Sequence, residues 1–276
     1  RMVVLDCVVP NTLVLGIEMA RNRDHGRALQ FALCAKTREC RQRYGEPRAR
    51  LNALMAQLKA APIGVRYRDA TTGESKEDQL TEARVAGLVR MYAYMPMAAS
   101  LLPLQLNEAA AGRYDGLMGL SKMLGEQMEN EMSTGMQLSV ICSEDAGELK
   151  PDPADDGTLM GGDFVRVLAE QCKVWPKGSR TATFRAPLKT GVPTLLLSGE
   201  FDPVTPPRYG DEVAKALPNG RHLVLRGQGH NVIGAGCMPR LMAKFIDKAD
   251  AKALDAKCLA ALPYTPPFTG FYGWEP

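Results

Sequence analysis

The 276-residue sequence lacks the features of several common protein classes. Its formal net charge is only +3 at pH 7, and no basic run alternates with aromatic residues as in nucleic-acid-binding proteins. No apolar run is long enough to span a bilayer. We therefore expect neither nucleic acid nor a membrane as a partner. The 45% hydrophobic and 24% charged residues are ordinary values for a globular protein.

Sequence patterns that bind metal ions are missing as well. The chain has three histidines, and it contains neither a C-x-x-C nor an H-E-x-x-H motif, which are usual spacings of zinc ligands. We therefore expect no metal and no cofactor. A signal-peptide pattern is also absent, and Arg1 is no plausible translation start, so we expect the chain to begin within a longer polypeptide.

What is present is a pattern typical of a βαβ unit. An apolar run at residues 193–197 is followed by a turn, a helical pattern, a second apolar run at residues 223–225 and then His230. A βαβ crossover makes its two strands parallel, so Asp202 and His230 should meet at one edge of the sheet. A carboxylate beside an imidazole is the acid and base half of a nucleophilic triad. Taken alone, Asp202 before Pro203 would be an ordinary turn residue.

This stretch resembles a known family. PTLLLSGEFDPVTPP and LPNGRHLVLRGQGH are similar to the secreted bacterial tripeptidyl aminopeptidases, an α/β-hydrolase branch related to the proline iminopeptidases. The resemblance implies that Asp202 is the triad acid and His230 the triad base, in the chain order nucleophile, acid, histidine. It also implies a partial α/β-hydrolase fold, in which residues 2–5, 193–197 and 223–225 form strands six to eight of a mostly parallel sheet.

The resemblance further implies a division of the chain into core and cap. We expect residues 1–15 and 180–276 to form the C-terminal part of the hydrolase core, and residues 16–179 to form a mainly helical cap or lid. Within this insertion, Thr81 is a predicted helix N-cap, and Gly73 marks a predicted hairpin. A cap above a catalytic edge limits which substrates reach the site.

Seven cysteines occur, and their spacing alone does not choose among the possible pairings. The resemblance implies the disulfides Cys34–Cys40, Cys142–Cys172 and Cys237–Cys258. Disulfides persist in oxidising compartments, so we predict a periplasmic or secreted protein. Cys7 is left over at a position where the family more often has glycine, and we interpret it as a small buried residue rather than a reactive thiol.

Two acidic residues are candidates for substrate binding. An aminopeptidase must hold the free α-ammonium group of its substrate, and carboxylates do this by charge-assisted hydrogen bonds. Glu144 and Asp145 follow Cys142, which the expected disulfide would hold in place. The alternative interpretation is an acidic surface loop.

The nucleophile elbow G-x-S-x-G does not occur in the sequence. Ser121 lies in a helical pattern, and Ser198 lies on the strand that leads to the acid, so neither is a credible substitute. His25 and His222 have no acid nearby in a motif and are interpreted as structural. We therefore expect the serine on an upstream segment or a separate chain, which would also cover the exposed edge of an incomplete sheet.

These observations predict a serine hydrolase of the aminopeptidase type, which releases short N-terminal peptides or proline-containing units from unblocked peptides. Its peptide substrate and a segment carrying the nucleophile are the expected partners. One alternative is a carboxylic-ester hydrolase, because fold and triad do not determine the acyl substrate. Another is a catalytically inactive fragment or a binding module.

Overall fold

The structure is a computed structural model that describes residues 1–131 and 133–274, with residues 126–131 described by their backbone alone. These residues form two compact units. The first comprises residues 1–26 and 133–264, and the second comprises the described residues of 27–132 and 265–276. The first boundary along the chain falls within helix α1 (Met19–Lys36). Across the described ranges, no helix combines the length and the apolar character needed to cross a membrane.

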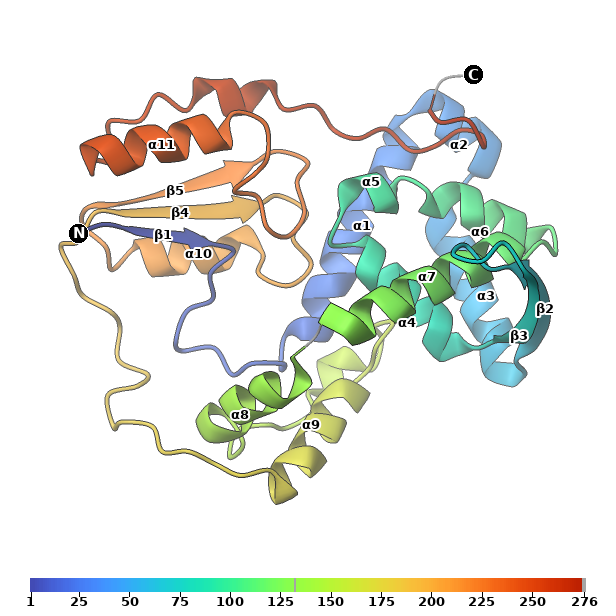
Figure 1. Ribbon diagram of the computed structural model, residues 1–276, viewed down its shortest axis with the longest axis horizontal. Helices are drawn as coiled ribbons and strands as arrows, with labels where there is room; N and C mark the ends of the chain where they lie inside the picture. Colours follow the sequence, from blue (N-terminus) through green and yellow to red (C-terminus); the bar gives the residue numbers. More distant parts are fainter. Residues whose placement is uncertain (132, 275–276) are drawn as a thin grey trace. The chain divides into compact units, whose positions relative to one another are not determined.

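A parallel sheet of three strands organises the first unit (Figure 1). Its strands are β1 (Val3–Asp6), β4 (Thr194–Gly199) and β5 (Gly220–Leu225), in the order β1-β4-β5. Both neighbouring pairs are parallel, so all three strands end at the same edge. The predicted strands and their parallel arrangement are confirmed.

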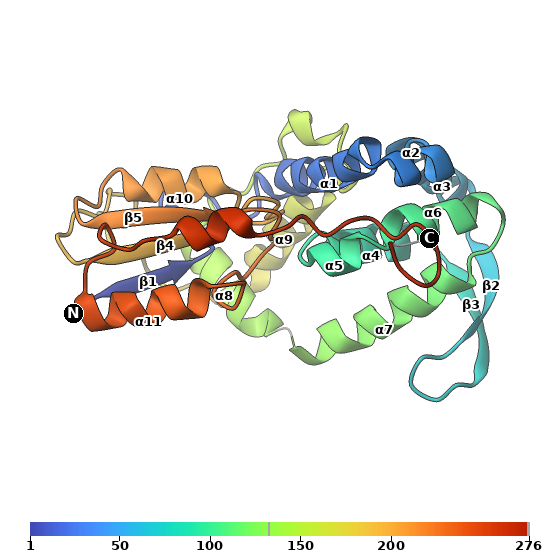
Figure 2. The ribbon, with the colours of Figure 1, turned by 90° about the horizontal axis from the view of Figure 1, so that it is seen from above.

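Helices cover both faces of this sheet. Helix α10 (Pro207–Ala214) lies on one face and helix α11 (Met238–Lys248) on the other (Figures 1 and 2). Side chains of β4 alternate between the faces, so Leu195 and Leu197 join a core cluster that includes Phe245 of α11. Every residue of β4 is buried, which is typical of a central strand covered on two faces.

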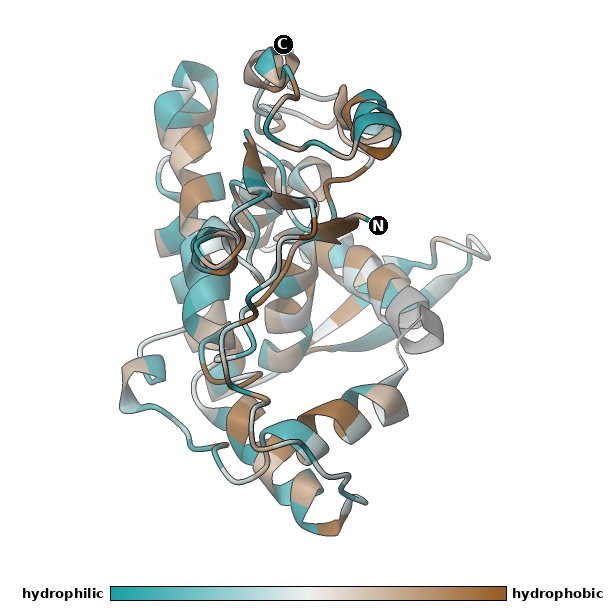
Figure 3. Ribbon diagram, turned by 90° about the vertical axis from the view of Figure 1, so that its left-hand side faces the viewer, coloured by the Kyte–Doolittle hydropathy of each residue, from teal (hydrophilic) through white to brown (hydrophobic). Residues whose placement is uncertain are grey.

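Strand β1 has a different environment because it lies at the edge of the sheet. In the described part of the chain it pairs only with β4, and Val3 is 39% exposed. Figure 3 shows this strand, beside the N-terminus, as hydrophobic. An exposed apolar edge is a template for pairing with a further strand. The expectation of a partner segment stays a prediction.

The remaining helices of the first unit are held by disulfides. Helices α8 (Thr134–Glu144) and α9 (Asp163–Val174) are joined by Cys142–Cys172, and a 3-10 turn, η1 (Pro153–Asp155), lies between them. Cys237, just before α11, is bonded to Cys258 in a second 3-10 turn, η2 (Lys257–Ala261).

The second unit is mainly helical and contains one hairpin. The hairpin strands β2 (Ile63–Arg68) and β3 (Ser75–Leu80) are antiparallel, as predicted. The Thr81 hydroxyl accepts a hydrogen bond from the Arg84 amide at 3.2 Å, which confirms the predicted N-cap of α4. Cys34 is bonded to Cys40, so all three expected disulfides are present. The helices after α1 are α2 (Arg38–Tyr44), α3 (Pro47–Ala60), α4 (Glu82–Tyr92), α5 (Pro96–Ala99), α6 (Leu102–Ala110) and α7 (Asp115–Glu131).

The two units do not coincide with the expected core and cap. Helices α8 and α9 fall within the expected cap, residues 16–179, but the compact units group them with the sheet. Leu15 and Arg185 contribute to this grouping, because both bond to Asp145 at the end of α8. The assignment of a cap role to residues 16–179 stays a prediction.

Candidate active site

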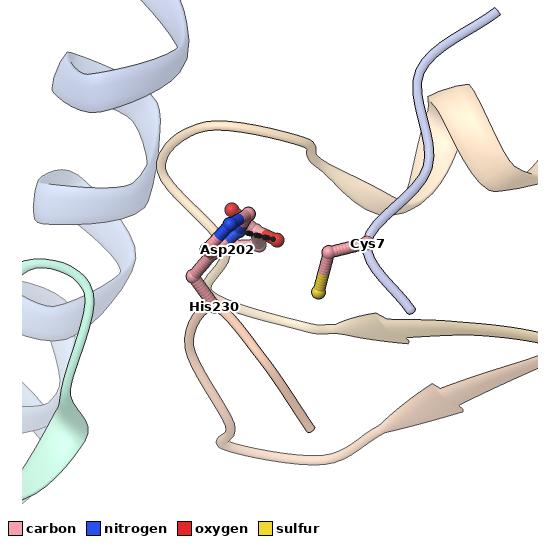
Figure 4. Close-up of side chains that lie close together, drawn as sticks. All are labelled: Cys7, Asp202 and His230. Atoms are coloured by element: carbon pink, nitrogen blue, oxygen red, sulfur yellow. Dashed lines mark hydrogen bonds and ion pairs between the residues drawn. The ribbon is translucent and has the colours of Figure 1, made fainter. Parts of the chain in front are cut away.

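Asp202 and His230 lie side by side at the carboxyl edge of the sheet. The imidazole Nδ1 of His230 is 2.9 Å from Oδ2 of Asp202 (Figure 4). Asp202 follows β4 and His230 follows β5, so the parallel βαβ unit brings together residues that are 28 positions apart. The predicted juxtaposition is confirmed, while the catalytic roles of the two residues are addressed below as a proposal.

The acid turn holds the Asp202 carboxylate in one orientation. Its Oδ1 accepts the backbone N–H groups of Val204 at 2.8 Å and Thr205 at 2.9 Å, and its Oδ2 accepts the Thr205 hydroxyl at 2.6 Å. Asp202 is 2% exposed. Burial opposes the negative charge, but the hydrogen bond and charge of His230 and the bonds from Thr205 outweigh it, so the pKa of Asp202 lies below its ordinary value. The carboxylate is therefore ionised at neutral pH.

This ionisation determines which ring nitrogen of His230 carries the proton. A carboxylate only accepts hydrogen bonds, so Nδ1 of the neutral imidazole is the donor and Nε2 carries the lone pair. That tautomer is the one a general base needs, with the carboxylate orienting the ring and stabilising its charged form. About one fifth of the His230 side chain is exposed, against none of the Asp202 side chain.

Glu200 connects the acid turn to the loop that carries the base. Its carboxylate accepts the Gly227 amide at 2.7 Å and the Tyr264 hydroxyl at 3.1 Å. The rings of Phe201 and Tyr264 also stack, with centroids 5.6 Å apart. The sequence places Glu200 in the turn but does not reveal this positioning role, because both of its partners come from other segments.

The segment at the end of β1 supports the chain just after the base. Asp6 accepts the backbone N–H groups of Val232 and Ile233, and the Cys7 sulfur accepts that of Asn231 at 3.2 Å. Cys7 is buried and has a φ of 63°, a left-handed conformation that suits glycine. Burial, together with the nearby charge of Asp202, raises the pKa of the thiol well above its ordinary range. Cys7 is therefore a protonated thiol, which agrees with its interpretation as a buried small residue.

A second hydrogen-bonded Ser-His-Asp set lies on the α10 face of the sheet. The imidazole of His222 is 2.9 Å from the Ser198 hydroxyl through Nε2 and 2.8 Å from Asp211 through Nδ1. His222 was interpreted as having no acid nearby, which is wrong, because Asp211 of α10 is its partner. Ser198 is 0% exposed, and a Cβ added at Gly210 of α10 would lie 2.4 Å from the same Nε2. No substrate can reach this serine, so the set is structural.

The remaining candidate residues lie outside the acid–base pair. Ser121 donates a hydrogen bond to the Met118 carbonyl at 2.9 Å within α7. Asp145 is 1% exposed, and its carboxylate accepts the Leu15 amide at 2.9 Å and pairs with Arg185. This pairing favours a structural role for Asp145. Glu144, at the last position of α8, is half-buried, and its role stays a prediction.

Comparison with known proteins identifies a family and a distant structural neighbour. Residues 158–258, which include both members of the acid–base pair, match the family described as TAP-like protein, Abhydrolase_4. No curated protein matches the chain. Among solved structures, a thermophilic esterase matches at 21% sequence identity over 45% of this chain and 49% of its own, with a TM-score of 0.21. The chain thus spans about half the length of that esterase. The match of residues 158–258 to this family agrees with the observed α/β fold, in which helices cover a parallel sheet.

Proposed function

We propose that this chain supplies the acid and the base of a serine hydrolase of the aminopeptidase type. The observation that carries the proposal is the buried hydrogen bond between Asp202 and Nδ1 of His230, at the edge where all three strands end. Asp202 acts as the orienting acid and His230 as the general base. The match of residues 158–258 to the TAP-like family supports the hydrolase class.

The reaction follows from the roles of these two side chains. His230 takes the proton from a serine hydroxyl as the serine attacks the acyl carbon, and returns it to the leaving amine. Asp202 holds the ring in the required tautomer and stabilises the imidazolium. Glu200 and Thr205 act as positioning residues, because they fix the base loop and the carboxylate.

The nucleophile comes from outside these residues. The sequence contains no G-x-S-x-G, and the two serines considered above are a buried strand residue and a helix residue. A segment that carries the serine would pair with the exposed edge of β1, which places its C-terminal end at the edge occupied by Asp202 and His230. By itself the chain is then inactive.

The substrates are peptides with a free N-terminus, from which a short N-terminal peptide or a proline-containing unit is released. Glu144 binds the α-ammonium group, since the Asp145 carboxylate is already paired with Arg185. Three disulfides are typical of oxidising compartments, and we place the protein in the periplasm or outside the cell. An ester hydrolase is the second candidate, because the triad does not select the acyl group.

The test compares this chain alone with the same chain joined downstream of a segment that carries G-x-S-x-G. A fluorophosphonate, which reacts with activated serines, should label only the joined polypeptide, and His230→Ala should abolish labelling. His222→Gln is the matched control, because that histidine also pairs with an aspartate but lies away from the sheet edge. Equal labelling of the His230→Ala protein would refute the assigned base.

Substrate class is tested on the joined polypeptide with three kinds of substrate. Peptide amides with free N-termini should be hydrolysed faster than N-blocked amides, and faster than simple carboxylic esters. Glu144→Gln should reduce the preference for free N-termini, whereas Glu170→Gln on the exposed surface of α9 should not. Faster turnover of esters would favour the ester hydrolase, and no turnover of any class would favour an inactive fragment or binding module.

A further inference from the structure

Three potential metal ligands of different chemistry converge beside the sheet edge. The Cys7 sulfur, a carboxylate oxygen of Asp202 and a ring nitrogen of His230 all lie within 4.8 Å of one another. Figure 4 shows that the three side chains come from separate loops, with Cys7 beside the hydrogen-bonded pair of Asp202 and His230. The sequence has no metal-binding motif because these residues are far apart along the chain, so local spacing carries no sign of the cluster.

The backbone around this cluster is held in an unfavourable conformation. Cys7 and Asn231 both have left-handed φ angles, of 63° and 65°, although neither is glycine. The two residues are joined by the bond from the Asn231 amide to the Cys7 sulfur. Left-handed backbone is unfavourable for most residues other than glycine and asparagine, and such strain is concentrated at functional sites. Among the described residues, Cys7 is also the cysteine outside the three disulfides.

We propose that Cys7, Asp202 and His230 form a three-ligand binding site for Zn²⁺. A thiolate, a carboxylate and an imidazole are all zinc ligands, and the thiolate with the imidazole disfavours Mg²⁺ and Ca²⁺. In a tetrahedral zinc site such ligand atoms lie roughly 3–4 Å apart, so shifts of about 1 Å or less would close the cluster. The thiolate and the carboxylate together neutralise the charge of the ion, as a buried site requires.

Binding exchanges one proton for the metal and involves no redox change. The Cys7 thiol loses its proton to solvent as the sulfur–zinc bond forms. The proton on Nδ1 of His230 moves to Nε2, which leaves Nδ1 to donate its lone pair to the metal. Asp202 exchanges its bond to Nδ1 for a bond to zinc, and water fills the fourth position.

Groups that already surround the cluster would orient the ligands. The Asn231 amide donates to the Cys7 sulfur, and the Thr205 hydroxyl donates to Oδ2 of Asp202. Hydrogen bonds of this kind hold ligands in position and tune metal affinity. Because zinc would take His230 away from Asp202, the metal and the proposed hydrolysis exclude each other. That consequence rests on the proposed function, but the binding itself does not.

The experiment uses Co²⁺ as a spectroscopic substitute for Zn²⁺ on the purified chain, without a histidine tag and without reductant, so that the disulfides remain intact. One Co²⁺ per chain should bind with a thiolate-to-cobalt charge-transfer band, and Zn²⁺ should displace it. Cys7→Gly should abolish the band and weaken Zn²⁺ binding by more than the ~10–100-fold that outer-shell changes cost. Glycine suits a φ of 63°, so this variant should fold; Cys7→Ser is the second variant.

Two further variants make the result decisive. Asp202→Asn should weaken metal binding, because it removes a ligand. His222→Gln should leave metal binding unchanged, because His222 bonds to Asp211 and Ser198 and has no thiol among its partners. The proposal is overturned if the wild-type chain binds no Co²⁺, if the band survives in Cys7→Gly, or if His222→Gln weakens binding as much as Asp202→Asn. None of these measurements depends on hydrolysis, so they separate failure of the metal site from failure of the proposed function.

Discussion

Gly199 is the position at which a single methyl group should disturb the acid–base pair most directly. It ends β4, just before the acid turn, and a Cβ added there would lie 1.9 Å from the Gly229 carbonyl oxygen and 2.5 Å from that of Gln228. Both contacts are with backbone, so no side chain can rotate away. The loop that carries His230 would have to move by about 1 Å to bring the closer contact to 3.0 Å.

The cost of Gly199→Ala follows from this geometry. Overpacking in a close-packed interior costs typically about 1–3 kcal/mol. For a unit of this size, each kcal/mol lowers the melting temperature by roughly 2–4 °C. The displaced loop should also lengthen the hydrogen bond between His230 and Asp202. In the joined polypeptide of the proposed function, a shift of about 1 Å should lower turnover by up to about 100-fold.

The assay is urea unfolding followed by circular dichroism, with nitrogen NMR of the three imidazoles as the local readout. Gly147→Ala is the matched control, because a Cβ there meets nothing within 4 Å and the residue lies in the same unit. The free energy of unfolding of this control should lie within about 0.5 kcal/mol of the wild-type value. If Gly199→Ala were as stable as the control, with the His230 resonances unshifted, the close packing of the two loops would be wrong.

Three further outcomes follow from the first unit. Arg185→Ala should lower the free energy of unfolding by about 3–5 kcal/mol, because it leaves the buried Asp145 carboxylate without its ion-pair partner, and equal stability in urea would contradict this. Replacing Cys142 and Cys172 by alanine should lower the free energy of unfolding by about 2–5 kcal/mol in the same assay, since this disulfide links residues 30 positions apart. An unchanged urea midpoint would refute this prediction. The pKa of Asp202 is lowered, so its ionised form contributes stability that is fully present above its ordinary pKa of 3.8 and is lost as the pH falls through the folded value. The free energy of unfolding, measured from about pH 6 to pH 2, should fall in the wild type and fall less in Asp202→Asn. Identical pH profiles of the two proteins would count against this contribution of Asp202.

Much of the architecture around the site could be predicted from the sequence, because local patterns determine it. The alternation of apolar runs with a helical pattern between them predicts parallel strands, and parallel strands must end at a common edge. Asp202 and His230 are therefore neighbours by topology alone, and the structure confirms this at 2.9 Å. The hairpin and the Thr81 cap are likewise local features. The disulfides were expected from resemblance to a family rather than from spacing.

Other features depend on contacts between distant segments, and no local pattern reports them. From the sequence, Glu200 is only a turn residue, but in the fold it accepts hydrogen bonds from Gly227 and Tyr264. From the sequence, His222 has no acidic partner, but in the fold it pairs with Asp211 of α10. Asp145 was expected to be a possible ligand for substrate, but its burial against Arg185 is visible only in the folded chain.

Cys7 has both kinds of feature, one predictable from local sequence and one that depends on contacts between distant segments. The apolar run at residues 2–5 is enough to predict that this cysteine follows a strand, and the resemblance to a family implies that it lies outside the three disulfides. The folded chain brings its sulfur within 4.8 Å of ligand atoms of Asp202 and His230, which no local pattern predicts. The physical reason is that secondary structure is a property of neighbouring residues, whereas the chemistry of a site depends on distances that only the packing of strands and loops determines.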